Sequence, residues 1–179
     1  MALSATIYHF DIQLANVDRG VYESLALKVA RHPSEAEDYL VARVLAYCLE
    51  LTEGLVFSRG LSEPDEPALA VRDLTGALRA WIDVGAPDAA RLHKAAKAAP
   101  RVAVYTHKDP ARLIEQLAGQ RIHRADQIEL WALDRELIAE LVARRDRRTA
   151  FDLTVTERHL YVNISGDSLE GTVVRHSLV

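Results

Sequence analysis

The middle of this chain alternates between short apolar segments and amphipathic ones, and this alternation restricts the folds available to it. Strands are predicted at residues 78–84, 101–106 and 127–133. Helices are predicted after each of them, at residues 87–98, 110–118 and 134–144. Strands and helices that alternate in this way form a parallel or mixed sheet with helices packed on it. We therefore expect an α/β fold with a mixed central sheet and flanking helices.

Both ends of the chain have the period-two pattern of antiparallel strands. Apolar and polar side chains alternate over residues 6–14 and again over residues 21–29, with the turn Asp18-Arg19-Gly20 between them. We expect a long antiparallel hairpin here, and a helix over residues 18–30 is the competing prediction. A second hairpin is predicted over residues 149–164.

One longer helix is predicted between the first hairpin and the alternating region. It begins near Ser34 and runs for about five turns. Glu37 stands three residues after Ser34, which is the spacing of a capping box. Short strands are predicted at residues 55–58 and 67–72, on either side of the acidic loop 62–67.

The composition is that of an ordinary globular protein. Of 179 residues, 49% are apolar and 27% are charged, and this length predicts one domain that spans residues 1–179. The net charge of −4 argues against a protein that coats nucleic acid through bulk electrostatics, but it leaves room for a local basic strip. The lone cysteine excludes disulfides within the chain and cysteine-based zinc sites. No apolar run approaches the ~20 residues of a membrane span, and no secretion signal is evident, so we expect a cytoplasmic location without membrane association.

A group of carboxylates forms the first candidate site. Asp83 ends an apolar strand, where a carboxylate needs a partner or a cleft, and such strand ends border the ligand crevice of open α/β sheets. Asp65 and Glu66 lie in a loop between two prolines, and Glu35 lies near a predicted helix start. Because Mg²⁺ takes one or two carboxylates with waters and phosphate oxygens, convergence of these side chains predicts a Mg²⁺ site. Solvated turns and a helix-dipole contact are the competing interpretations.

Three cations on the following helix form the second candidate site. Arg91, Lys94 and Lys97 are three residues apart and therefore lie near one side of the helix. They are expected to bind phosphates or to stabilise charge that develops in a transition state, and a solvated helix face is the alternative. His32 and His93 are further candidates, although a single surface histidine is commonly inert.

Several common catalytic patterns do not occur in the sequence. Neither of the two glycine-rich phosphate-binding motifs, Gly-x-x-x-x-Gly-Lys-Ser and Gly-x-Gly-x-x-Gly, is present. The sequence also contains no Gly-x-Ser-x-Gly elbow and no His-x-x-x-His pair. We therefore do not expect a nucleotide-binding fold, a serine hydrolase or a zinc hydrolase.

Five short motifs together resemble the YaeQ family of small bacterial proteins. They are Ala5-Thr6-Ile7-Tyr8, Ala30-Arg31-His32-Pro33-Ser34-Glu35, Ser58-Arg59-Gly60-Leu61, Asp65-Glu66-Pro67, and Trp81-Ile82-Asp83-Val84-Gly85 followed by Pro87-Asp88. The resemblance extends over most of the chain. It implies a restriction-endonuclease-like fold, a variant of the PD-(D/E)xK nuclease core.

That core places acidic side chains around one or two Mg²⁺ ions, with a lysine usually two residues after the last acid. By resemblance, the metal ligands are the helix acid Glu35, the loop acids Asp65 and Glu66, and the strand acid Asp83. Gly85 stands at the usual lysine position. We therefore predict that Lys94, on the following helix, replaces the missing lysine.

These expectations lead to a Mg²⁺-dependent phosphodiesterase that acts on nucleic acid. Asp83 and the other acids would hold the metal, and Lys94 would orient the attacking water. Arg91 and Lys97 would bind neighbouring phosphates. The alternative, which Gly85 favours, is a catalytically inactive nuclease-fold protein that binds nucleic acid or a protein partner. A small-molecule hydrolase that uses the same acids is a third alternative.

Overall fold

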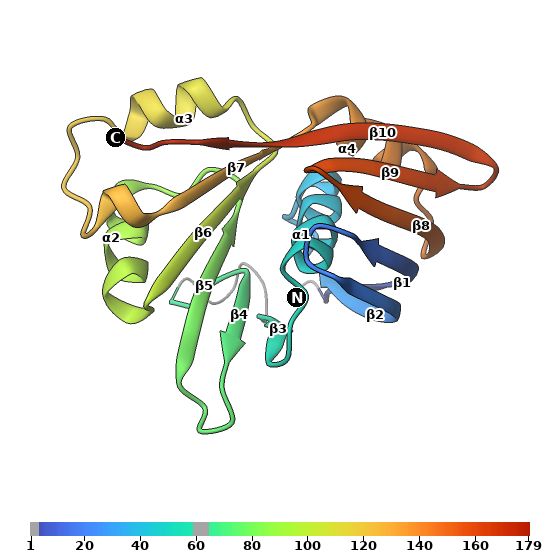
Figure 1. Cartoon of the computed structure of the whole chain (residues 1–179), viewed down its shortest axis with the longest axis horizontal. Coiled ribbons are helices and arrows are strands. Elements are labelled where there is room, and N and C mark those ends of the chain that lie inside the picture. The colour runs from blue at the N-terminus through green and yellow to red at the C-terminus, as the bar shows by residue number, and fades with distance from the viewer. Residues whose placement is uncertain (1–3, 59–64) are drawn as a thin grey trace. The chain divides into compact units, whose positions relative to one another are not determined.

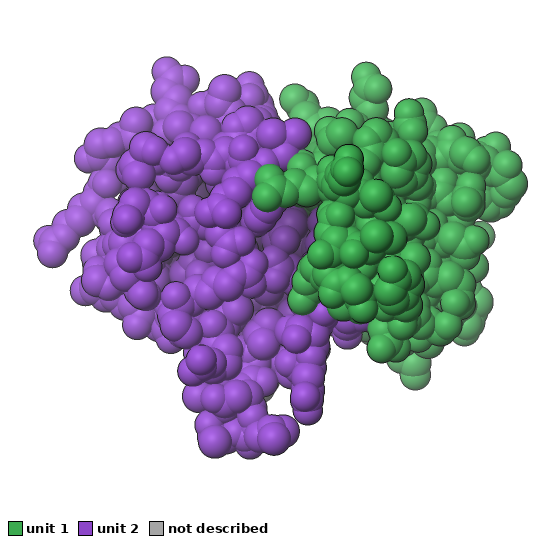
Figure 2. Space-filling view, in the orientation of Figure 1, with its two compact units in different colours: residues 1–41, 133–173 green, residues 42–132, 174–179 purple. Residues whose placement is uncertain are grey.

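The chain folds into two compact units, which Figure 2 shows in green and purple. The structure is a computed structural model, and it describes residues 4–58 and 65–179 (Figure 1). Unit 1 contains residues 1–41 and 133–173, and unit 2 contains residues 42–132 and 174–179. The single domain expected over the whole chain stays a prediction.

Unit 1 contains five neighbouring strands in the order β2-β1-β8-β9-β10. The strands are β1 (Thr6–Asn16), β2 (Val21–Arg31), β8 (Arg148–Thr156), β9 (His159–Ile164) and β10 (Asp167–His176), of which β10 extends at its end into unit 2. β1 pairs antiparallel with β2 and parallel with β8, whereas β8, β9 and β10 pair antiparallel in succession. The two predicted hairpins are therefore confirmed, and the competing helix over residues 18–30 is excluded.

Strand β10 was not predicted, and Gly171 explains both its position and its weak signal. A Cβ atom at Gly171 would lie 2.7 Å from Cβ of Asp134 and 3.0 Å from Cβ of Leu137. Helix α4 (Arg135–Arg144) therefore packs against β10 at a point where only a glycine leaves enough room. The same glycine interrupts the alternation of side chains from which a strand is recognised.

Unit 2 contains the predicted mixed sheet, in the order β7-β6-β5-β4-β3. The strands are β3 (Leu55–Phe57), β4 (Leu69–Arg72), β5 (Leu78–Val84), β6 (Arg101–Thr106) and β7 (Glu129–Leu133), whose last residue belongs to unit 1. β5, β6 and β7 are parallel, and β3, β4 and β5 are antiparallel. Helices α2 (Ala89–Ala98) and α3 (Pro110–Leu117) share a buried apolar core with β5, β6 and β7.

Aspartate side chains cap the first turns of three of the helices. The side chains of Asp88, Asp109 and Asp134 accept hydrogen bonds from backbone N–H groups in the first turns of α2, α3 and α4. The segment between α3 and β7 includes a short 3₁₀ helix at Ala125–Gln127. Among the described residues, no helix combines the length and the apolar character that a membrane crossing requires.

The predicted capping box of the longest helix is wrong. Helix α1 (Glu37–Glu50) begins at Glu37 rather than near Ser34. Ser34 Oγ lies 2.7 Å from Nδ1 of His32, and the N–H of Glu35 donates to the carbonyl of His32 at 2.8 Å. Residues 32–35 therefore form a separate turn before the helix. Glu37 forms an ion pair with Arg145 instead of bonding to the backbone of Ser34.

Candidate functional site

Asp83, at the end of β5, is buried and paired with an arginine. Only 3% of its side chain is exposed. Arg91 of α2 donates from Nε to Oδ2 at 2.7 Å and from Nη2 to Oδ1 at 2.9 Å. The backbone N–H of Ala68 also donates to Oδ1, at 3.4 Å. Both carboxylate oxygens thus accept charge-assisted hydrogen bonds, which offset the cost of burying the charge.

The turn after β5 brings Arg91 back to Asp83, and Gly85 has a conformational role in this turn. Gly85 has a φ of 100°, which a lysine adopts only with strain. Asp88 then accepts a hydrogen bond from the N–H of Arg91 at 2.8 Å, which fixes the first turn of α2. The Arg91 guanidinium also lies over the ring of Trp81, 5.5 Å from its centroid. The backbone conformation therefore accounts for a glycine at position 85, where the resemblance implies a lysine.

The loop that carries Asp65 and Glu66 is attached to the same helix by two cations. Lys94 forms an ion pair with Asp65, and 54% and 80% of these side chains are exposed. The hydrogen bond from Lys94 and its charge hold the pKa of Asp65 below its usual range. Arg91, one turn earlier, donates from Nη2 to the backbone carbonyl of Glu66 at 2.7 Å. Arg91 and Lys94 therefore both have acceptors within the protein.

The structure brings several of the predicted residues together in unit 2. We call this group the Asp83 cluster: Asp83, Arg91, Asp65, Lys94 and the backbone carbonyl of Glu66. Lys97 lies exposed on α2 and forms no ion pair with the residues described. Glu35 belongs to unit 1, where it is buried and its Oε1 accepts a hydrogen bond from the N–H of His32 at 3.4 Å. The catalytic and binding roles of all these residues stay predictions.

The carboxylates of the Asp83 cluster do not fit a metal ion as they are placed. Within residues 4–58 and 65–179, no group of three or more His, Cys, Asp or Glu side chains is arranged to hold one. Asp83 and Asp65 each have a cationic partner, so Mg²⁺ would have to displace Arg91 from Asp83. Residues 59–64 lie outside the described residues, and with them most of the Ser58–Leu61 motif and half of the predicted acidic loop.

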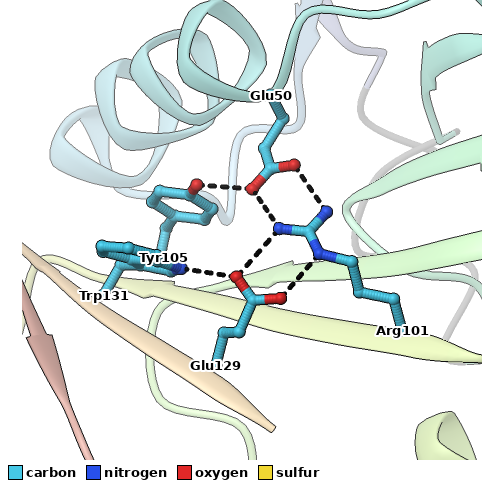
Figure 3. A network of polar contacts seen from close by, with 5 residues as sticks. All are labelled: Glu50, Arg101, Tyr105, Glu129 and Trp131. Atoms are coloured by element: carbon cyan, nitrogen blue, oxygen red, sulfur yellow. Dashed lines mark hydrogen bonds and ion pairs between the residues drawn. The ribbon is translucent and has the colours of Figure 1, made fainter. Parts of the chain in front are cut away.

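A second polar network, which the sequence did not predict, joins α1, β6 and β7 within unit 2 (Figure 3). Arg101 at the start of β6 donates two hydrogen bonds to Glu50, at 2.7 and 2.9 Å, and two to Glu129, at 2.6 and 3.0 Å. The hydroxyl of Tyr105 donates to Glu50 at 2.5 Å, and the indole N–H of Trp131 donates to Glu129 at 3.2 Å. We call these five residues the Arg101 network.

The charge states in the Arg101 network are strongly fixed. Hydrogen bonds from Arg101 to Glu50 raise the pKa of the guanidinium. Burial, together with the charge of Glu50, raises the pKa of Tyr105 well above its usual range. Burial is the largest single effect on Glu129 and opposes its ionisation. The hydrogen bonds and charge of Arg101, the hydrogen bond from Trp131 and the charge of Arg175 together outweigh burial, so that the pKa of Glu129 is lowered. The network therefore holds the end of α1 on the sheet of unit 2.

Glu129→Gln is expected to reduce the acid sensitivity of the protein. Because folding lowers the pKa of Glu129, its ionised form stabilises the fold above the unfolded pKa, and this contribution disappears as the pH falls through the folded pKa. At pH 7 we expect the variant to lose about 1 to 2 kcal/mol of unfolding free energy. Urea titrations at neutral and acidic pH should show the difference between variant and wild type shrinking with acid. A difference that does not change with pH would contradict this assignment.

Comparisons with known proteins agree with the resemblance found in the sequence. The model of the YaeQ family, described as YaeQ protein, matches residues 1–173. The "Uncharacterized protein YaeQ" of Escherichia coli (strain K12) is 33% identical over 172 residues, which are 95% of this chain and 94% of that protein. The protein of the same name from Salmonella typhi is also 33% identical, over 171 residues.

Two solved structures extend the similarity to the fold. The crystal structure of the YaeQ protein from Pseudomonas syringae has a TM-score of 0.87 and 31% identity, and the match covers 96% of this chain and 95% of that one. The YaeQ protein from Xanthomonas axonopodis pv. citri has the same TM-score and identity, with 97% and 99% covered. The matches in sequence and in structure extend over nearly the whole chain, and we conclude that it belongs to the YaeQ family.

Proposed function

We propose that this chain is a nuclease-like protein that binds nucleic acid without cleaving it. One observation carries the proposal: Asp83, which the resemblance makes a metal ligand, is one half of a buried ion pair with Arg91. Both of its oxygens already accept hydrogen bonds. A carboxylate in this state serves to hold α2 and the Glu66 loop on the sheet rather than to coordinate a metal.

The topology of unit 2 supports the nuclease-like part of the proposal. The resemblance implies a PD-(D/E)xK core, in which acids lie on a mixed sheet beside helices. In unit 2, Asp83 ends β5, which pairs antiparallel with β4 and parallel with β6. Helix α2 follows directly and carries the cations that contact the acids. This arrangement is compatible with such a core whose metal ligands have acquired protein partners.

The outer side of α2 supports binding to a polyanion. Arg91 and Lys94 are paired, but Lys97 lies on the surface of the same helix with no carboxylate partner among the described residues. A local cation of this kind is available to phosphates even in a protein whose net charge is −4. The electrostatic contribution is local, so we expect binding that is weak and sensitive to salt.

A Mg²⁺-dependent phosphodiesterase is the second candidate function. It is favoured by the position of two carboxylates, Asp65 and Asp83, beside cations that lie one turn apart on α2. For this function, Arg91 must release Asp83 when the metal binds. Mg²⁺ would then supply an activated water and neutralise phosphate charge.

Binding and cleavage assays on the full chain distinguish the two candidates. Fluorescence anisotropy with labelled single-stranded and duplex DNA and RNA measures binding at low salt. The same oligonucleotides and a supercoiled plasmid, incubated with Mg²⁺ or Mn²⁺, measure cleavage. We expect salt-sensitive binding and no cleavage. Asp83→Asn is the test variant, and Asp152→Asn, which makes the same change at an exposed position of β8, is its control.

Each outcome of these assays has a defined meaning. Metal-dependent cleavage that Asp83→Asn abolishes and Asp152→Asn retains would establish the second candidate in place of the first. Cleavage that survives Asp83→Asn would come from another site or from a contaminating nuclease. Absence of binding to every nucleic acid would overturn the first candidate and would favour a protein partner. Circular dichroism of each variant verifies that it is folded.

A further inference from the structure

Two histidines from different segments of unit 2 contact each other on the surface of α2. His93 lies in α2, and His123 lies between α3 and the 3₁₀ helix that follows. The backbone N–H of His123 donates to Nδ1 of His93 at 3.0 Å, and the two rings meet edge to face, with centroids 6.3 Å apart. Since Nδ1 of His93 is an acceptor in this bond, the neutral ring carries its proton on Nε2. Nε2 of His93 is then a hydrogen-bond donor held in a fixed orientation.

The charged groups that shift the pKa of His93 are all positive. Partial loss of hydration lowers the pKa of His93, and so do the charges of Lys97, Arg121 and His123. No carboxylate is among the groups that act on this ring. Lys97 and Arg121 are exposed, and neither forms an ion pair with the part of the chain that the structure describes. A chain with net charge −4 therefore has a concentrated positive region here.

Arg124 fixes this region to the end of α2. The backbone of Arg124 is left-handed, with a φ of 50°. Its side-chain Nη2 donates to the backbone carbonyl of Ala99 at 3.0 Å and also to that of Ala96. These carbonyls form the negative end of the helix dipole, and the guanidinium offsets that charge. The segment with Arg121 and His123 is thereby attached to α2, so little ordering cost remains for a ligand.

We propose that this region binds a phosphate group, and we call it the histidine patch: His93, Lys97, Arg121 and His123. Its donors suit a phosphate oxyanion, since a guanidinium fork, an ammonium and an imidazole N–H present hydrogen bonds to several oxygens at once. The patch is distinct from the Asp83 cluster, whose cations Arg91 and Lys94 are occupied by carboxylates. The phosphate belongs either to a nucleic acid backbone, in which case the site rests on the proposed function, or to a small phosphate ester.

Charge removal at matched positions tests the histidine patch. The test variant is Lys97→Gln/Arg121→Gln, and the control is Arg79→Gln/Arg112→Gln, which removes two charges from exposed positions of β5 and α3. The probes are inorganic phosphate, a nucleoside monophosphate and a single-stranded oligonucleotide. We expect the test variant to bind the tightest of these at least about tenfold more weakly, and the control to change less than about twofold. With the oligonucleotide, the slope of log affinity against log salt should fall by about two.

A second readout locates the bound phosphate. Ring proton resonances of His93 and His123, assigned with His93→Gln and His123→Gln, should shift when a probe binds to the wild type. Binding of inorganic phosphate and the monophosphate identifies a small ester, and binding of the oligonucleotide alone identifies a nucleic acid backbone. Equal losses in the test and control variants, or histidine resonances that no probe shifts, would overturn the site.

The same data separate this site from the proposed function. If phosphate binds at the histidine patch but no nucleic acid binds anywhere, the proposed function fails and the site stands. If nucleic acid binds with equal affinity to wild type and to both double variants, and neither inorganic phosphate nor the monophosphate shifts the histidine resonances, the site fails and the proposed function stands.

Discussion

Replacing Arg91 with methionine is expected to lower the free energy of unfolding by about 3 to 5 kcal/mol. The change leaves Asp83, whose side chain is 3% exposed, without a counter-charge in the interior of unit 2. Removing one partner of a buried ion pair is costly because the other must remain desolvated. Methionine keeps an unbranched chain beside Trp81, but it also removes the hydrogen bond to the Glu66 carbonyl and the cation–π contact, so the loss includes these two contacts with the ion pair. Urea unfolding followed by circular dichroism measures it.

A second substitution tests whether this loss of stability arises from the Asp83 carboxylate, which Arg91→Met leaves without a counter-charge. Asp83→Asn in the Arg91→Met background is expected to recover most of the lost stability, because an amide needs no counter-charge. Lys94→Met is the control, since it breaks the exposed pair with Asp65 and should have a much smaller effect. Losses that simply add in the double variant would show that Arg91 and Asp83 are not coupled, and would remove the basis for a structural role of Asp83.

Gly54→Ala is expected to cost about 3 kcal/mol, from backbone strain and a steric clash together. Gly54 has a φ of +87°, and a Cβ atom there would lie 2.0 Å from the carbonyl oxygen of Arg72. Arg72 lies in β4 and donates its N–H to the carbonyl of Gly54 at 3.1 Å, so the two backbones cannot separate without breaking this contact. Thermal and urea unfolding of the variant measure the loss.

Gly76→Ala separates the two contributions. Gly76 has a φ of +86°, almost the value of Gly54, but a Cβ atom there meets nothing within 4 Å. This variant should lose only about 1 kcal/mol, which is the cost of the left-handed backbone alone. The difference between the two variants is then the cost of the clash with Arg72. Equal losses would mean that the chain around Gly54 relaxes freely.

Local sequence patterns were sufficient to predict many of the strands and helices of unit 2. Strands β5 and β6 lie where their apolar runs placed them, and α2 and α3 begin at Ala89 and Pro110, close to the predicted starts at residues 87 and 110. The start of α1 was mistaken because Ser34 and Glu37 have a spacing that a capping box shares with other turns. Strand β10 was missed for a different reason: the close approach of a helix requires a glycine where a strand pattern requires a side chain.

The site was harder to predict than the fold, because its side chains contact residues that are distant in the sequence. Residues spaced by three share one side of α2, but the spacing does not reveal what each one faces: Arg91 contacts Asp83, Lys94 contacts Asp65, and Lys97 contacts neither. The Arg101 network is a further example, because Glu50 and Arg101 are 51 positions apart. Each of the two strands shows only one charged residue at its start, Arg101 in β6 and Glu129 in β7, and this does not identify a partner.

Unit 1 combines two segments that are far apart in the sequence, residues 1–41 and 133–173, and this has a consequence for its synthesis on the ribosome. Strands β1 and β2 emerge first, but the parallel partner of β1 is β8, whose pairing begins with Arg148 opposite His9. Nearly all of unit 2 is translated in between. Until then β1 presents an unpaired edge with apolar side chains such as Ile12, which is the kind of surface that aggregates or recruits chaperones. Emergence of β8, β9 and β10, rather than of the first hairpin, therefore sets the earliest time at which unit 1 is complete.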